Sequence, residues 1–273
     1  EYGRLGAYFL GAYALMYVVG GRIIDWLGTR TGFVLMLAFW SMASMATGLA
    51  QSIAGLSLSR FLLGVGEGGA FPGAGKAVAE WFPTRERSFA FGVFNTGSAL
   101  GSVVAVPFAS YVIDASNWRT VFYLTGAFGL LWCVLWLILY RLPEQSKIIS
   151  AEELAYIREG RVSNDAVEEA GTIRWFGLFH YRQVWGLVLA KFLTDAAFYF
   201  YSFWIPRYLH DIHGLELMAL ALYGWIPYLF MAGGSSIGGW LGYRLLKCGM
   251  PLGQARMITL AVAAFLMPIS LLV

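Results

Sequence analysis

Long apolar runs, separated mostly by short polar connections, recur along the whole chain. Each run has about the 20 residues that an α-helix needs to cross roughly 30 Å of hydrocarbon. The runs predict eight membrane-spanning helices, near residues 5–21, 33–50, 56–80, 89–113, 120–140, 184–206, 217–241 and 257–273. No signal-peptide pattern precedes the first run and the chain stops inside the last one, so we expect both ends to be truncations.

One long polar segment interrupts this pattern. It divides the chain into a predicted N-terminal helical bundle, a cytoplasmic linker and a C-terminal helical bundle, over residues 1–140, 141–183 and 184–273. Within the linker, Ser150 and Glu153 have the spacing of a capping box, which predicts a short amphipathic helix that Gly160 ends. Residues 174–179 predict an interfacial segment. A solvated connection is the simpler interpretation of this linker, and a regulatory role is the alternative.

The composition agrees with a bilayer environment, since 59% of the residues are hydrophobic and 13% are charged, with a mean hydropathy of +0.64. Connections after the first, third, fifth and seventh runs hold thirteen Lys and Arg, whereas the opposite connections hold only Arg4, Arg119 and Arg207. The positive-inside rule therefore places the first set in the cytoplasm. We expect a multi-pass monomer in the inner (plasma) membrane, in contact with the lipid bilayer. The net charge of +3 does not favour a nucleic-acid partner.

Two ionisable residues stand out because charge within a membrane span is costly. Arg60 and Glu67 are seven positions apart, which returns them to nearly the same helix face with a rise of ~10.5 Å between them. Glycines surround the acid and would let neighbouring helices or a ligand approach closely, at positions 64, 66, 68 and 69. The spacing predicts that both side chains point into one cavity, and an ion pair that only holds helices together is the alternative.

A second pair, Lys191 and Asp195, has the four-residue spacing that brings side chains together on a helix, and structural and functional roles are equally open. The aromatic segment that follows includes Tyr199 and Trp204, whose faces suit the apolar side of a sugar ring. Lys76 lies close enough to the cytoplasmic end of its span to reach the interface. No metal-ligand spacing, cofactor motif or catalytic constellation emerges, so we expect no enzyme activity, no cofactor and no metal.

The stretch Gly21-x-x-x-Asp25-x-x-Gly28-x-Arg30 resembles the signature of the major facilitator superfamily, in the cytoplasmic loop between its second and third helices. The resemblance implies a helical bundle of that family, with this chain covering roughly helices two to nine of twelve. It also implies that these four residues belong to an inter-helix latch that gates alternating access.

Residues Arg60 to Pro72 are similar to the fourth helix of the anion:cation symporter branch, which includes bacterial sugar-acid transporters and animal sialic-acid and vesicular glutamate carriers. The resemblance implies that Arg60 binds a substrate carboxylate and that Glu67 couples transport to a proton. It also implies ligand-facing positions for Tyr13 and for the residues from Asn95 to Ser98.

Residues 192–209 look most like the seventh helix of hexuronate transporters. We therefore expect a symporter that takes up a small organic anion, such as glucuronate or galacturonate, together with a proton. Tyr199 and Trp204 would contact the sugar, and Asp195 is a second candidate for proton coupling. Other organic anions such as galactonate, tartrate or an aromatic carboxylate remain open, and so does a membrane receptor that senses a metabolite without transporting it.

Overall fold

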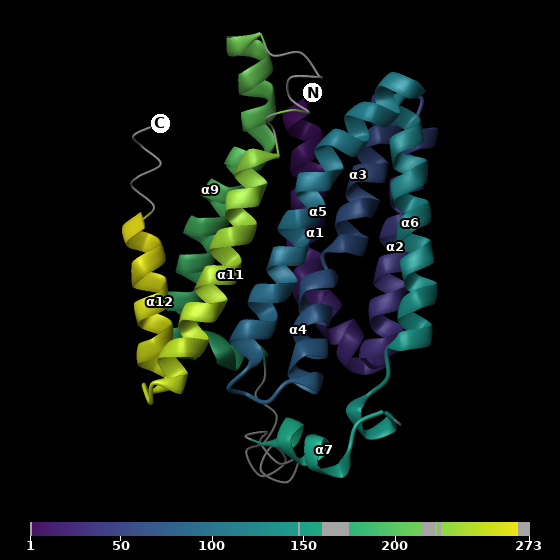
Figure 1. The fold of residues 1–273 in the computed structure, drawn as a ribbon. Helices are drawn as coiled ribbons and strands as arrows, with labels where there is room; N and C mark the ends of the chain where they lie inside the picture. The colour runs from purple at the N-terminus through teal and green to yellow at the C-terminus, as the bar shows by residue number, and fades with distance from the viewer. Residues whose placement is uncertain (1, 147, 160–174, 215–221, 223–224, 267–273) are drawn as a thin grey trace.

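The structure is a computed structural model that describes residues 2–146, 148–159, 175–214, 222 and 225–266. Every regular element in these ranges is helical (Figure 1). The N-terminal helices are α1 (Tyr2–Leu27), α2 (Thr29–Leu49), α3 (Ile53–Glu67), α4 (Ala70–Trp81), α5 (Arg87–Ala115) and α6 (Trp118–Leu139). The remaining elements are the 3-10 turns η1 (Pro143–Gln145) and η2 (Trp175–His180), and the helices α7 (Ala151–Arg158), α9 (Arg182–His213), α11 (Ile226–Lys247) and α12 (Leu252–Leu266).

Within the described residues, four helices are long and apolar enough to cross a membrane, namely α1, α2, α5 and α6. The all-α membrane fold predicted from the sequence is confirmed. The other predicted spans correspond to the α3–α4 pair and to α9, α11 and α12, with residues 215–221, 223–224 and 267–273 outside the described part of the chain.

The prediction of one continuous helix over residues 56–80 is wrong, because α3 ends at Glu67 and α4 begins at Ala70. Pro72 explains the break: it has no N–H to donate to the carbonyl of Gly68, and its ring would clash with that carbonyl in a regular helix. The neighbouring bonds persist, with Gly68 N–H donating to Gly64 at 3.0 Å and Gly73 N–H to Gly69 at 3.1 Å. The chain therefore stays coiled through an interruption directly after Glu67.

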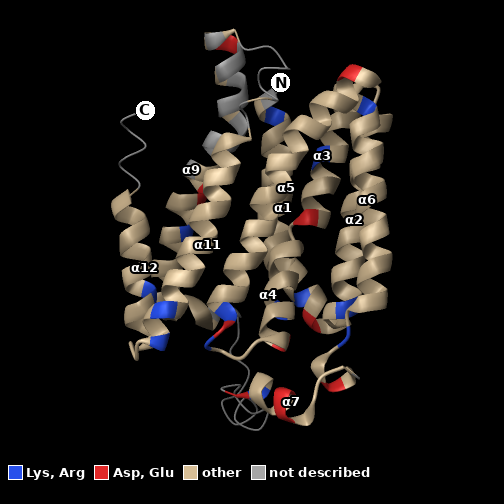
Figure 2. Ribbon diagram, in the orientation of Figure 1, with Lys and Arg blue, Asp and Glu red and all other residues tan. Residues whose placement is uncertain are grey.

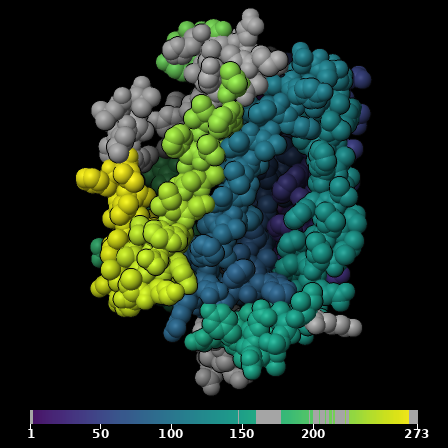
Figure 3. All heavy atoms as spheres, viewed as in Figure 1, coloured from purple at the N-terminus to yellow at the C-terminus, as the bar shows by residue number. Residues whose placement is uncertain are grey.

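Three helix pairs make the most extensive contacts: α2 with α6, α1 with α3, and α5 with α11. Glycines allow close approach in each pair. A methyl group on Gly92 of α5 would lie 3.2 Å from the Cα atom of Gly239 of α11. Beside this contact, the hydroxyls of Thr96 and Ser236 share a hydrogen bond of 2.6 Å. Figure 3 shows α11 packed along α5, and a hollow between α5 and α6 with atoms of α1 at its floor.

Many Lys and Arg positions lie at the end of the bundle that carries α7, the predicted cytoplasmic end (Figure 2). The helix α7 begins as predicted, since the Ser150 hydroxyl accepts the Glu153 N–H at 3.1 Å. It ends at Arg158, and Gly160 lies outside the described residues. Tyr156 donates a hydrogen bond of 2.6 Å to Glu86, which holds α7 against the connection between α4 and α5. That carboxylate raises the pKa of the Tyr156 hydroxyl above its ordinary value.

Candidate functional site

A cavity of about 440 Å³ lies between α1, α3 and α9. Its volume falls within the range of small-molecule sites. The wall is mostly apolar and is formed by Gly3, Leu5, Gly6, Ala7, Phe9, Leu10 and Leu63. Arg60 and Glu67 of α3 and Trp204 of α9 complete the lining. Among the described residues, the cavity therefore presents one cation, one carboxyl group and one indole to whatever occupies it.

The local structure of α3 explains why Arg60 and Glu67 share this cavity. Ser52 caps the helix by accepting the Gly55 N–H at 3.1 Å. From there α3 runs uninterrupted to Glu67, so the seven-residue spacing returns both side chains to one face. Both side chains are half-buried. The predicted shared cavity is observed, and the guanidinium carbon of Arg60 also lies 5.6 Å from the centroid of the Phe122 ring of α6.

Neighbouring helices fill the space beside the glycines around Glu67. A methyl group on Gly66 would meet the backbone nitrogen of Trp40 of α2 at 2.6 Å. One on Gly68 would meet the carbonyl oxygen of Tyr13 of α1 at 2.7 Å, and Gly64 faces the same helix even more closely. Of the two roles considered for these glycines, close helix packing is the one the structure shows. The cavity lies beside this packed surface, toward the start of α1.

Tyr13 and Tyr199 lie next to each other, where α1 meets α9. Their ring centroids are 6.4 Å apart in an edge-on arrangement, and Tyr13 also contacts Phe9 at 5.8 Å and Tyr17 at 6.0 Å. Phe9 belongs to the cavity wall, so this aromatic cluster continues from the cavity along α1. Trp204 lies on the cavity itself. The predicted aromatic residues from both parts of the chain are thus brought together around one region.

Asn95 and Ser98 are placed elsewhere. Asn95 lines a second cavity of about 430 Å³ between α5, α11 and α12, together with Arg256. Ser98 is exposed, and its carbonyl accepts a hydrogen bond of 3.3 Å from Ser102. In this structure the described lining of the Arg60 cavity therefore comes from α1, α3 and α9, and α5 packs on α11. The ligand-facing role of Asn95 and Ser98 stays a prediction.

Lys191 and Asp195 form the ion pair that their spacing predicts, with 2.9 Å between Nζ and Oδ1. The Asp195 side chain is 37% exposed, which makes a solvated pair on one helix the plain description of this contact. Among the residues that the structure describes, no group of three or more His, Cys, Asp or Glu side chains could hold a metal ion.

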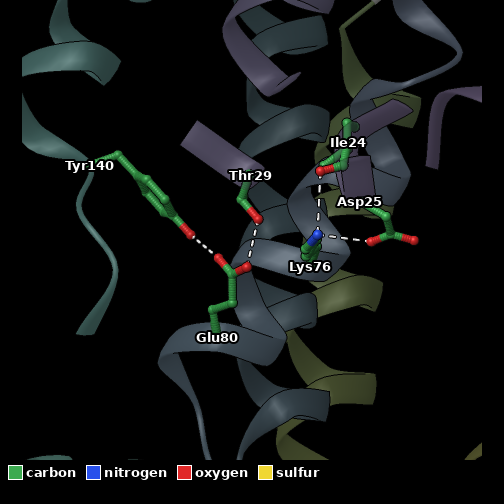
Figure 4. A network of polar contacts seen from close by, with 6 residues as sticks. All are labelled: Ile24, Asp25, Thr29, Lys76, Glu80 and Tyr140. Atoms are coloured by element: carbon green, nitrogen blue, oxygen red, sulfur yellow. Dashed lines mark hydrogen bonds and ion pairs between the residues drawn. The ribbon is translucent and has the colours of Figure 1, made fainter. Parts of the chain in front are cut away.

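The four predicted latch residues lie at the α7 end of the bundle. Asp25 forms an ion pair of 2.8 Å with Lys76 of α4, whose ammonium also donates to the carbonyl of Ile24 at 3.3 Å (Figure 4). Gly28 joins α1 to α2 with a φ of 77°, a left-handed conformation that favours glycine. Gly21 lies against Pro72, to which an added methyl group would be 3.4 Å away.

Arg30 connects α2 to the end of α6. Its guanidinium donates a hydrogen bond of 2.5 Å to the carbonyl of Leu137, and its own carbonyl accepts one of 3.2 Å from the indole of Trp136. Asp25 and Arg30 thus bridge different pairs of helices, α1 to α4 and α2 to α6. Both bridges lie among the first six helices.

Sequence reasoning missed Glu80 and underestimated Lys76. Glu80 of α4 accepts a hydrogen bond of 2.6 Å from Thr29 of α2 and another from the hydroxyl of Tyr140, which follows α6 (Figure 4). Thr29 and Tyr140 are buried, so these bonds satisfy hydroxyls that water does not reach. A signal was present, since Lys76 and Glu80 are four residues apart and share one face of α4.

The profile of the Major Facilitator Superfamily matches residues 1–273, and the chain belongs to this family of membrane transporters. The galacturonate transporter of Dickeya chrysanthemi is 32% identical over 271 residues, which are 98% of this chain and 79% of that protein. The hexuronate transporter of Escherichia coli (strain K12) is 34% identical over 269 residues, 94% of this chain and 62% of the relative. The D-galactonate transporter of Escherichia coli O6:H1 is 30% identical over 264 residues, 94% of this chain and 61% of the relative.

The chain thus spans less than two thirds of the last two relatives. All three are transporters and not enzymes, as expected for this chain from its sequence. The resemblance to hexuronate transporters, first seen in residues 192–209, is confirmed at the level of the whole chain.

Proposed function

We propose that the protein is a proton-coupled symporter that imports a carboxylate sugar, such as a hexuronate, by alternating access. The observation that carries this proposal is the cavity in which Arg60 and Glu67 of α3 meet Trp204 of α9. A cation and a carboxyl group in a mostly apolar cavity suit an organic anion that travels with a proton. The named substrates of the relatives are anions of this kind.

Arg60 binds the substrate carboxylate in this proposal. Its guanidinium offers parallel N–H groups that match the two carboxylate oxygens, a geometry that the ammonium of a lysine does not reproduce. The sugar ring lies against Trp204, with the Tyr13–Tyr199 cluster adjoining it. Asn95 and Ser98 join the ligand only if α5 moves relative to α11, and that movement is part of the alternating-access proposal.

Glu67 carries the proton. Before substrate binds, the positive charge of Arg60 lies in the same cavity as Glu67 and favours the carboxylate form of that side chain. A bound substrate anion takes over that charge, and a proton on Glu67 then restores neutrality in surroundings where an uncompensated charge is costly. Substrate and proton therefore enter together. Asp195, paired with Lys191 on the same helix as Trp204, is the second candidate for proton transfer.

The rest of the protein follows the same scheme. The protein is a monomer in the inner membrane. Its two bundles, residues 1–140 and 184–273, rock relative to each other about the linker 141–183. The α7 end faces the cytoplasm, in keeping with its basic residues (Figure 2). The contacts of Gly21, Asp25, Gly28 and Arg30 at that end form the gating latch.

Uptake of radiolabelled galacturonate by proteoliposomes that contain the complete protein tests this proposal. Arg60→Lys should abolish saturable uptake, whereas Arg119→Lys, an exposed arginine stacked on Trp118, should leave it unchanged. Unlabelled glucuronate and D-galactonate, supplied as competitors, rank the possible substrates, and the D-galactonate relative makes the second the natural alternative. Binding without exchange of label would contradict transport and indicate a receptor.

A further inference from the structure

The cavity arginine contacts an aromatic ring that comes from a helix outside the cavity. The guanidinium carbon of Arg60 lies over the Phe122 ring of α6, 5.6 Å from its centroid. A cation within about 6 Å of an aromatic face is attracted to it, and the attraction grows when water is excluded. Phe122 in turn meets the edge of Trp118 at 5.9 Å, with the two rings at 85°. Arg60 is therefore held by a side chain of α6 as well as by its own helix.

The position of Phe122 is set by the close packing of α6 on α2. Asn117 caps α6 by accepting the N–H groups of Arg119 at 3.0 Å and Thr120 at 3.2 Å. One turn after Phe122, a methyl group on Gly126 would lie 2.7 Å from the carbonyl oxygen of Ser41 of α2. This close contact packs α6 firmly on α2 and thereby holds the backbone that carries the Phe122 ring.

The contact has a consequence for substrate binding. An arginine side chain has several rotatable bonds, and ordering it on ligand binding costs affinity. An aromatic ring attracts the charge of the guanidinium and uses none of its N–H donors. The contact with Phe122 thus restricts the orientation of the guanidinium through its face and not through its N–H groups.

We propose that Phe122 is a positioning residue that orients Arg60 for the carboxylate of the substrate. The inference rests on the proposed function, since it assumes that Arg60 binds that carboxylate. Phe122 itself is not part of the cavity wall and acts through Arg60. A purely structural Phe122 would instead affect the amount of folded protein and leave the affinity of the remaining transporter unchanged.

The test compares three variants of the complete protein by galacturonate uptake in proteoliposomes, normalised to folded protein. Phe122→Leu, which removes the aromatic face, should raise KM by about 3- to 10-fold with little change in maximal rate, as expected for loss of one cation–π contact in ligand binding. Phe122→Tyr, which keeps the face, should restore KM to within about 2-fold of the parent. Phe128→Leu is the matched control, because Phe128 lies on the same helix, is 59% exposed and contacts Phe108.

Equal KM values for Phe122→Leu and Phe128→Leu would overturn the inference, and so would a Phe122→Tyr variant as impaired as Phe122→Leu. If Phe122→Leu does not fold, Phe122→Met supplies the same comparison with a longer apolar side chain. Arg60→Lys, measured alongside, distinguishes the proposed function from the positioning role of Phe122. Wild-type uptake by Arg60→Lys would refute the proposed function, whereas a loss of uptake with no effect at Phe122 would refute only the positioning role.

Discussion

A methyl group added at Gly66 would enter the backbone of α2. In the structure, the ideal Cβ position lies 2.6 Å from both the backbone nitrogen and the Cβ atom of Trp40, and 2.7 Å from its Cα atom. Backbone atoms cannot turn aside as the end of a flexible side chain can. The Gly66→Ala variant must therefore separate α3 from α2, or bend one of them, directly beside Glu67.

The size of the effect follows from this distance. Ordinary contact begins near 3.4 Å, so Trp40 must retreat by about 0.8 Å in a closely packed interior. Overpacking of this kind costs about 1–3 kcal/mol, and alanine returns about 0.5–1 kcal/mol through its better helix propensity. The midpoints of these two ranges give a net loss of about 1 kcal/mol. In a chain of this size that corresponds to a fall in apparent Tm of roughly 2–4 °C.

Thermal unfolding of the detergent-solubilised protein, followed by fluorescence-detected size exclusion, measures this fall. Gly101→Ala is the control, because Gly101 lies inside α5 with no atom within 4 Å of the added methyl group. This variant should gain stability or leave it unchanged, so only Gly66→Ala should lower Tm. Equal shifts would refute the conclusion that α3 and α2 pack through Gly66.

Two further predictions concern the α7 end. Glu80→Ala should lower stability by about 1–3 kcal/mol for each buried hydroxyl, Thr29 and Tyr140, that loses its acceptor, measured by the same unfolding assay. Tyr156→Phe should increase backbone hydrogen exchange in α7, because the bond to Glu86 is lost. The pKa of Tyr156 is raised, so its hydroxyl stays protonated at every pH below the ordinary pKa of tyrosine and can donate to Glu86. This hydrogen bond is lost only as pH rises through the raised pKa. The difference between Tyr156→Phe and the parent should therefore persist from about pH 6 to about pH 9.

Exposed residues provide the controls for both variants. Glu152→Ala removes a carboxylate from the solvent face of α7, and Tyr111→Phe removes a hydroxyl from a tyrosine that is 73% exposed. Both control variants should match the parent protein in unfolding temperature and in hydrogen exchange of α7. A Glu80→Ala variant no less stable than Glu152→Ala would contradict the role of Glu80, and unchanged exchange in α7 would contradict the role of Tyr156.

Helix positions were largely predictable from the sequence, because a backbone in lipid must satisfy its own hydrogen bonds and long apolar runs leave it little choice but a helix. The seven-residue spacing of Arg60 and Glu67 likewise predicted their shared cavity, since one helix fixes the relative direction of both side chains. The sequence pattern did not predict the helix interruption after Glu67, although Pro72 lies five residues further along the chain. The length of an apolar run predicts a membrane span, but it does not show where a proline without a backbone N–H interrupts the helix.

Contacts between helices were much less predictable. Asp25 and Lys76 are 51 residues apart, and nothing in the sequence pattern of either helix identifies the other as its neighbour. Asn95 shows the same limit, because helical periodicity gives the faces of α5 without indicating which one meets α11. The role of Glu80 was not predictable from the sequence, because the buried hydroxyls that it satisfies, Thr29 and Tyr140, lie on other elements.

The proposed roles of Arg60 in carboxylate binding and of Glu67 in proton coupling are tested most directly with the Glu67→Gln variant in proteoliposomes. Galacturonate uptake is driven there by an imposed proton gradient. This substitution keeps the size of the side chain and removes the group that binds a proton. In the proposed mechanism Arg60 still binds the carboxylate in this variant. We therefore expect exchange of labelled for unlabelled galacturonate to continue, while concentrative uptake in response to the gradient disappears. Concentrative, proton-driven uptake by Glu67→Gln at the rate of the parent would contradict the account.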